Sequence, residues 1–222
     1  MKKFALIIAC LFAAFRLAAQ DCTQYYYLQK NRVIEMSSYD EKGAFIGKGI
    51  SKVSDVTTTN GVVTAIVVSE SFDKNGKSQG KFSASYKCSG GVMMIDMNFN
   101  DSKKPGSASQ KNNANFSLEE YPSGMKVGDH LKDAIMEMKE DLGNETIVAT
   151  SKTTARMVVA KETVTTAAGT WSCLKITYKT ITTVKGYNVP PQTIESTEWY
   201  VPNFGIVKSQ MLGVTREVTS LR

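Results

Sequence analysis

Hydrophobic and polar residues alternate in short runs along most of the chain. From Tyr25 onward, runs rich in Val, Ile, Thr and Tyr are separated by clusters of Gly, Asn and Asp at intervals of about ten residues, a spacing typical of antiparallel strands. One run places apolar side chains on a single face, namely Met93, Ile95, Met97 and Phe99. The pattern predicts an all-β, mainly antiparallel domain, a meandering sheet of about ten strands with little helix.

Turn-forming residues indicate where the strands reverse. The segments 39–43 and 72–76 share one order of residues, Tyr-Asp-Glu-Lys-Gly and Phe-Asp-Lys-Asn-Gly. In each, the Asp can accept hydrogen bonds from the turn backbone, and the Gly can adopt the positive φ of a tight loop. The resulting prediction is hairpin turns at 40–43, 59–62, 73–76, 202–205 and near 213, with a mobile loop over 101–114.

The hairpin near residue 203 contains a tryptophan that invites two interpretations. Pro202 followed by Asn203 predicts a type I turn, closed by a bulge at Gly205. Trp199 and Tyr200 then point to opposite faces of the preceding strand. An exposed Trp199 would suit a binding surface, whereas a mostly buried Trp199 is the commoner outcome for this residue type.

The segment 129–142 supports two readings. Five apolar residues recur at helical intervals, namely Leu131, Ala134, Ile135, Met138 and Leu142. Read in steps of two, Ala134, Met136 and Met138 share the face of a strand. Periodicity alone favours the helix.

The first twenty residues have the layout of a secretory signal peptide. Lys2 and Lys3 precede an apolar run over 4–15, and the small residues Ala18 and Ala19 follow it. The run is too short to span a bilayer as a helix, and no later apolar stretch approaches that length.

We therefore expect residues 1–19 to be a signal peptide, cleaved near Ala19 or Gln20, and residues 20–222 to form one soluble exported β domain in the periplasm or outside the cell. Cys10 offers the alternative of a lipid-attached leader, but the apolar run continues beyond it. Removal of the leader takes three positive charges and lowers the net charge from +6 to +3. Because the remaining lysines are scattered among acids, a nucleic-acid partner is not expected.

Three cysteines remain after that cleavage, namely Cys22, Cys88 and Cys173. An oxidising compartment favours one disulfide and leaves one thiol over. In a meander, Cys22 and Cys88 lie at the same end of the sheet, although a flat sheet would hold them about 14 Å apart, so a bridge needs curvature or a crossing N-terminal segment. This reasoning favours Cys22–Cys88 over pairs with Cys173 and leaves the pairing open.

The sequence offers no complete set of catalytic or metal-binding residues. His130 is the single histidine, it lies beside a Gly-Asp turn, and no nucleophile motif accompanies it. One histidine and three distant cysteines do not make a zinc site. We therefore expect no catalytic residues, no metal and no cofactor, and we interpret the methionines as core residues.

Two stretches resemble the TapB-like family of exported proteins, whose function is essentially unknown. Residues 156–176 are similar to the family's "R-x-V…E…P-A-G-T-F-x-C-x-K-I", with Ala167 in place of Pro and Trp171 in place of Phe. Residues 198–208 are similar to its "E-W-Y…G-x-V-K" ending. The resemblance implies strands rather than a helix over 134–141.

The same resemblance implies a curved sheet similar to lipid-binding half-barrels, or a β-sandwich-like arrangement. It supports the hypothesis of a non-enzymatic envelope protein that binds an apolar small molecule or lipid. The expected ligand-binding residues are Met93, Ile95, Met97, Phe99 and Trp199. The alternatives are an envelope scaffold without a ligand and an unrecognised hydrolase.

Overall fold

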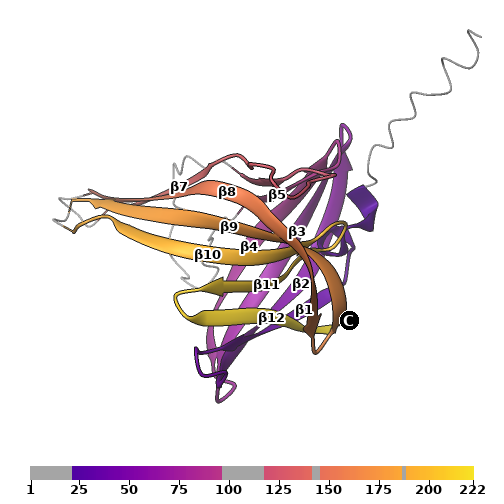
Figure 1. Ribbon diagram of the computed structural model, residues 1–222, viewed down its shortest axis with the longest axis horizontal. Coiled ribbons are helices and arrows are strands. Elements are labelled where there is room, and N and C mark those ends of the chain that lie inside the picture. Colours follow the sequence, from indigo (N-terminus) through magenta and orange to yellow (C-terminus); the bar gives the residue numbers. More distant parts are fainter. Residues whose placement is uncertain (1–21, 97–117, 142–145, 187–188) are drawn as a thin grey trace, which may run out of the picture.

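The computed structural model describes residues 22–96, 118–141, 146–186 and 189–222 (Figure 1). Within these ranges, twelve strands form one antiparallel sheet. The strands are β1 Val33–Tyr39, β2 Phe45–Thr59, β3 Val62–Asp73, β4 Ser78–Ser89, β5 Val92–Asp96, β6 Glu119–Tyr121, β7 Ala134–Asp141, β8 Thr146–Thr166, β9 Gly169–Lys185, β10 Gln192–Val201, β11 Gly205–Met211 and β12 Val214–Leu221. The all-β antiparallel prediction is confirmed, with twelve strands instead of about ten.

The first and last strands of the described residues, β1 and β12, lie side by side in the middle of this sheet. The strand order is β6-β5-β4-β3-β2-β1-β12-β11-β10-β9-β8-β7, so β1 pairs with β12. From β1 the chain meanders outward to the edge at β6, continues at the opposite edge with β7, and meanders back. Consecutive strands are therefore neighbours everywhere except between β6 and β7, and these two edges approach each other as the sheet curls into a nearly closed, barrel-like form.

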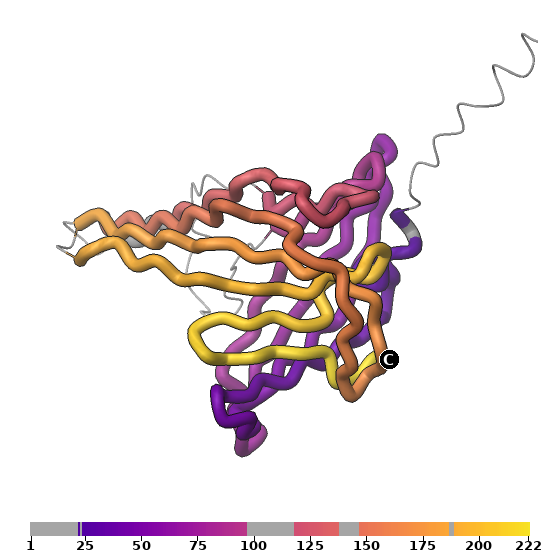
Figure 2. Tube along the Cα trace, in the orientation of Figure 1, coloured from indigo at the N-terminus to yellow at the C-terminus, as the bar shows by residue number. Residues whose placement is uncertain are grey.

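Bulges in the long β8–β9 hairpin produce part of the curvature. The pairing of these strands shifts between Thr154 and Met157 and again between Val158 and Ala160, and Ala155 has a φ of 51°. Each bulge adds a residue to one strand, which bends the strand and increases its twist. Figure 2 shows the β8–β9 hairpin bending sharply part of the way along its length.

The two repeated turns form as predicted. The Oδ1 atom of Asp40 accepts hydrogen bonds from the backbone N–H groups of Lys42 and Ala44, at 2.9 and 2.8 Å. Asp73 does the same for the residues two and four positions after it, at 2.9 Å each. The glycines that follow have φ values of 79° and 80°. The remaining predicted turns, at 59–62, at 202–205 and near 213, also join consecutive strands, whereas 101–114 lies outside the described residues.

The type I assignment for the turn after β10 is wrong. The Phe204 N–H donates to the Val201 carbonyl, as in a β-turn, but Asn203 has a φ of 66°. A positive φ at the third position defines a type II turn, in which Asn is one of the few residues tolerated. Pro202 fits the second position of both turn types, and therefore the sequence alone does not distinguish a type I from a type II turn.

Residues 134–141 form a strand, so the family resemblance predicted this segment correctly and the helical periodicity did not. Each residue of β7 pairs with β8, from Ala134 opposite Thr153 to Asp141 opposite Thr146. Strand pairing satisfies the backbone groups that a helix would satisfy internally, and tertiary context overrides periodicity here.

The N-terminal segment packs into the sheet. It contains two short 3-10 helices, Cys22–Gln24 and Tyr26–Leu28, and no helix in the described residues is long and apolar enough to cross a membrane. A disulfide joins Cys22 to Cys88 on β4, with the Cα atoms 5.6 Å apart, which is the pair that the sequence favours. Tyr27 is buried and stacks on Tyr86 at 4.8 Å between ring centres.

Candidate functional site

The predicted ligand-binding face of β5 points into the interior of the sheet. Met93 is 2% exposed and pairs with Cys88 on one side and Tyr121 on the other. Ile95 lies one step further along the same face and packs against the hydrophobic core. Met97 and Phe99 lie outside the described residues. The described half of the predicted face therefore belongs to the interior.

A cavity of about 170 Å³ with one apolar and one polar wall begins at Ile95 and extends to the opposite edge of the sheet. Its apolar walls come from Ile95, Leu118, Ala134, Ile135 and Met136. Its polar walls come from Asp96, Glu119, Ser151, Thr153 and Thr180. Because β5 and β6 form one edge of the sheet and β7 and β8 the other, the cavity occupies the seam where the sheet nearly closes.

A buried arginine contacts the backbone beside two of the segments that line this cavity, although it does not itself line the cavity. Arg156 is 1% exposed, and its Nη1 donates to the carbonyl oxygens of Glu120 and Lys132, each at 3.2 Å. These acceptors lie on β6 and just before β7, so one side chain ties the two edges together. Arg156 lies within the β8 bulge that begins at Ala155, which places its side chain on the interior face together with Val158.

Aromatic rings cover one side of the guanidinium. The Arg156 Cζ atom lies 4.8 Å from the ring centre of Tyr121, a cation–π contact. Tyr121 is fully buried and stacks on Tyr200 at 4.9 Å. The Tyr200 hydroxyl in turn donates to the hydroxyl of Tyr25 at 3.4 Å. The arginine is thus the end of a stack that continues into the N-terminal segment.

Two glutamates accompany Arg156. Glu119 accepts hydrogen bonds from the hydroxyls of Tyr121 at 3.3 Å and Thr153 at 3.5 Å. Glu198 on β10 is 2% exposed. Burial, followed by the negative charge of Glu119, raises the pKa of Glu198 to about 8, while Arg156 opposes the shift only in part. Glu198 therefore carries its proton at neutral pH.

Several polar atoms of this cluster have no hydrogen-bond partner among the described residues. They are Nε and Nη2 of Arg156 and Oε1 of Glu198. Buried polar atoms are rarely left unpaired, because each costs about 1–3 kcal/mol of desolvation. We refer to Arg156, Glu198, Glu119, Tyr121 and Thr153 as the polar cluster. Together with the cavity it is the candidate binding site.

Trp199 lies on the other face of the sheet from the polar cluster. It alternates with Glu198 and Tyr200 along β10 and is 7% exposed. Its indole N–H donates to the carboxylate of Glu162, and the ammonium groups of Lys175 and Lys208 lie 5.3 and 5.4 Å from its ring centre. These polar side chains cover the indole. Trp199 belongs to the same continuous hydrophobic core as Met93, but it is not one of the residues that line the cavity at Ile95.

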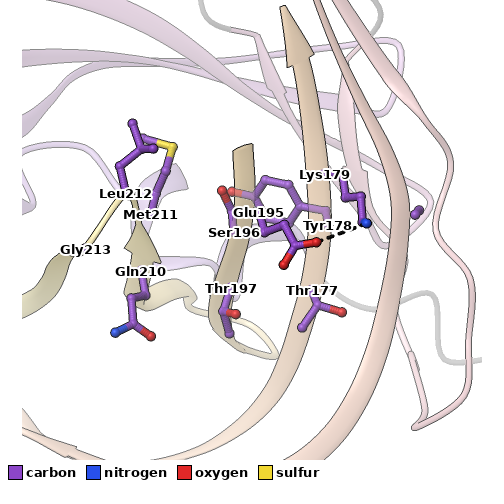
Figure 3. A pocket seen from close by; sticks show the side chains of 11 residues that line it. Thr177, Tyr178, Lys179, Glu195, Ser196, Thr197, Gln210, Met211, Leu212 and Gly213 are labelled. Carbon is purple, nitrogen blue, oxygen red and sulfur yellow. Dashed lines mark ion pairs between the residues drawn. The ribbon is translucent and has the colours of Figure 1, made fainter. Parts of the chain in front are cut away.

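A second hollow of about 380 Å³ lies where the β11–β12 hairpin ends beside β9 and β10. Figure 3 shows Met211 and Leu212 at one end of it and the ion pair of Lys179 with Glu195 at the other. The two charged groups are 3.0 Å apart, and threonines and Gln210 contribute to the walls. This hollow is more polar than the cavity at the seam and lacks the apolar lining that the sequence predicts.

Sequence reasoning did not select the polar cluster. Arg156 and Glu198 are nevertheless the first residues of the two stretches that resemble the TapB-like family, and this position was the available signal. What the sequence could not show is burial, because charged residues are rarely fully buried and the bulge at Ala155 carries no glycine. His130 is exposed, as its position beside a turn predicted.

The fold is shared with solved bacterial structures. An exported-protein candidate with a YmcC-like fold from Bacteroides fragilis is 19% identical, with a TM-score of 0.67 over 87% of this chain and 96% of the other. A lipoprotein candidate from Parabacteroides distasonis is 20% identical, with a TM-score of 0.70 over 91% and 100%. At these identities the likeness establishes the fold. None of the curated proteins matches the chain.

A family model described as DUF3108-like matches residues 29–220, most of the chain. The chain therefore belongs to the DUF3108-like family. The match includes every strand except the last residue of β12, and both parts of the candidate site. The narrower resemblance to the TapB-like proteins is not tested by it and stays a prediction.

Proposed function

We propose that this DUF3108-like protein is a non-enzymatic domain of the bacterial cell envelope that holds the apolar part of a small molecule inside its curved sheet. The observation that carries the proposal is the cavity of about 170 Å³ at the seam between β5 and β7. Half of its lining residues are apolar, and the wall that they form is costly to hydrate.

The size of the cavity indicates the size of the bound group. An apolar cavity of about 150 Å³ accepts a molecule as large as benzene. The seam cavity therefore suits about six carbon atoms, the end of a chain or a small ring. Burial of about six carbons at about 0.8 kcal/mol each corresponds to dissociation constants near the millimolar range.

Three features support the envelope location. The first twenty residues have the layout of a secretory leader. The Cys22–Cys88 disulfide is typical of an oxidising compartment. The two structural neighbours are described as candidates for an exported protein and a lipoprotein. On this proposal residues 1–19 are removed, and residues 20–222 work as one exported domain.

An envelope scaffold without a ligand is the second candidate. Met93, on the predicted binding face, is 2% exposed and close-packed in the core. The seam cavity is also smaller than the roughly 300–1,000 Å³ of most ligand sites. If the interior only stabilises the fold, the cavity will bind nothing saturably.

A titration with hexan-1-ol followed by NMR separates the two candidates. The alcohol has six carbons, and its binding should shift the backbone amide signals of residues around the cavity, such as Ala134 and Thr153. Ile95→Asp places a carboxylate in the apolar wall and should weaken binding at least tenfold. Val68→Asp is the matched control, because Val68 is 38% exposed on β3 and pairs with Lys52.

The control variant should bind hexan-1-ol as the unmodified protein does. Absence of a saturable shift in the unmodified protein would leave the scaffold as the better account. Binding that survives Ile95→Asp at full strength would place the ligand elsewhere and overturn the assignment of this cavity.

A further inference from the structure

Arg156 is a fully buried cation without an ion-pair partner. No ion pair joins it to a carboxylate in the part of the chain that the structure describes, although the charges of Arg156, Glu119 and Glu198 all act on the pKa values of Tyr121 and Tyr178. A buried charge is costly unless a counter-charge and hydrogen bonds compensate it. The two backbone carbonyls and the Tyr121 ring supply only part of that compensation.

The unpaired atoms of the guanidinium share one edge. Nη1 makes both hydrogen bonds, and Nε and Nη2 make none. The N–H groups of Nε and Nη2 point in the same direction, and their spacing matches the two oxygen atoms of a carboxylate. Oε1 of Glu198, which is also unpaired, belongs to the same polar cluster.

We propose that the Nε–Nη2 edge of Arg156 binds the carboxylate of an apolar carboxylic acid whose hydrocarbon part occupies the seam cavity. The inference rests on the proposed function and adds the chemical class of the ligand. Glu119 and Thr153 connect the two parts of the site, because both line the cavity and Glu119 accepts the hydroxyl of the tyrosine that stacks on Arg156.

The charges of the cluster agree with an acidic ligand. Burial raises the pKa of Glu198 to about 8, so at neutral pH its carboxyl group is uncharged and can donate a hydrogen bond. Glu119 already accepts two hydroxyl groups. An external carboxylate therefore supplies the counter-charge for Arg156 without facing a charged Glu198, and Glu119, which lines the cavity, is the one charged carboxylate of the polar cluster beside it.

The test compares hexanoate with hexan-1-ol, measured by the same NMR titration at pH 7. The two probes have the same number of carbons and differ in the head group. The unmodified protein should bind hexanoate about tenfold or more tightly than hexan-1-ol, as expected for a charged bidentate contact. Arg156→Lys keeps the positive charge but lacks the two parallel N–H donors of the Nε–Nη2 edge. Its hexanoate affinity should therefore fall about tenfold while its hexan-1-ol affinity stays the same.

Lys152→Met is the matched control for a general effect of positive charge. Lys152 precedes Thr153 on β8, and its side chain is 48% exposed and pairs with Asp133. Its loss should change hexanoate affinity less than twofold. Equal binding of the two probes by the unmodified protein would overturn the carboxylate inference and leave the proposed function intact, and this comparison does not depend on whether Arg156→Lys folds. Failure of both probes to bind would overturn both proposals.

Discussion

At the scale of single residues, the unusual feature is an acid and a base that are both buried and do not form an ion pair. Glu198 is 2% exposed and Arg156 is 1% exposed. The acid adapts by retaining its proton, because burial and Glu119 raise its pKa to about 8. The base cannot adapt in this way, because a guanidinium stays charged in proteins. This asymmetry is what makes Arg156 the group that requires an external partner.

The raised pKa of Glu198 predicts how stability depends on pH. In the unfolded chain Glu198 loses its proton near pH 4.5, whereas in the folded protein it keeps the proton up to about pH 8. Between these values the folded state binds more protons, so the free energy of unfolding falls as pH rises. The shift corresponds to a loss on the order of 4 kcal/mol across this window.

Urea unfolding at pH 5 and pH 8 checks this prediction. Glu198→Gln has no proton to lose, so its stability should change much less between the two pH values, and it should exceed that of the unmodified protein at pH 8. Glu195→Gln, on the exposed side of β10, should follow the unmodified protein. Parallel pH profiles for the unmodified protein and Glu198→Gln would show that Glu198 does not carry the buried proton.

At the scale of elements, the two repeated hairpins differ in one respect that the sequence does not reveal. Gly47 and Gly80 occupy equivalent positions in the β1–β2 and β3–β4 hairpins, with φ values of 156° and 147°. A Cβ atom on Gly47 would collide with the backbone carbonyl oxygen of Phe72, whereas one on Gly80 would meet nothing within 4 Å. Gly47 is therefore required by close backbone approach as well as by conformation.

This difference predicts unequal costs for the same substitution. Gly80→Ala should lower the free energy of unfolding by about 1 kcal/mol through backbone strain alone. Gly47→Ala carries the same strain plus the collision and should cost about 2–3 kcal/mol more. Urea unfolding of both variants measures the difference, and equal costs would mean that β2 and β3 separate freely at this point.

The sequence predicted more of the strands and turns than of the candidate binding site. Asp40 and Asp73 specify their turns through local hydrogen bonds, so the sequence alone predicts these hairpins. The β7 strand required information beyond the helical spacing of its apolar residues, because its pairing with β8 is long-range. The burial of Arg156 could not be predicted from the sequence for a similar reason. It depends on a bulge without glycine and on hydrogen-bond acceptors from β6 and the segment before β7.

At the scale of the whole molecule, the first and last strands, β1 and β12, pair at the centre of one sheet, and the two edges of that sheet approach each other at the seam. The N-terminal segment is fixed to β4 by the disulfide and contributes Tyr27 and Leu28 to the core. The two edges are connected by Arg156 and by the ion pair of Lys132 with Glu120, at 2.9 Å. The cavity and the polar cluster both lie at this junction, where strand pairing is interrupted and side chains take its place.

The central claim is that the interior of this sheet holds a small apolar ligand in the cell envelope. The most direct test is a crystal structure of the unmodified protein soaked in hexanoate at a concentration well above the expected millimolar dissociation constant. The account predicts a bound hexanoate whose chain lies in the seam cavity, present also in Val68→Asp and absent from Ile95→Asp. A seam cavity that stays empty in the unmodified protein would contradict the claim.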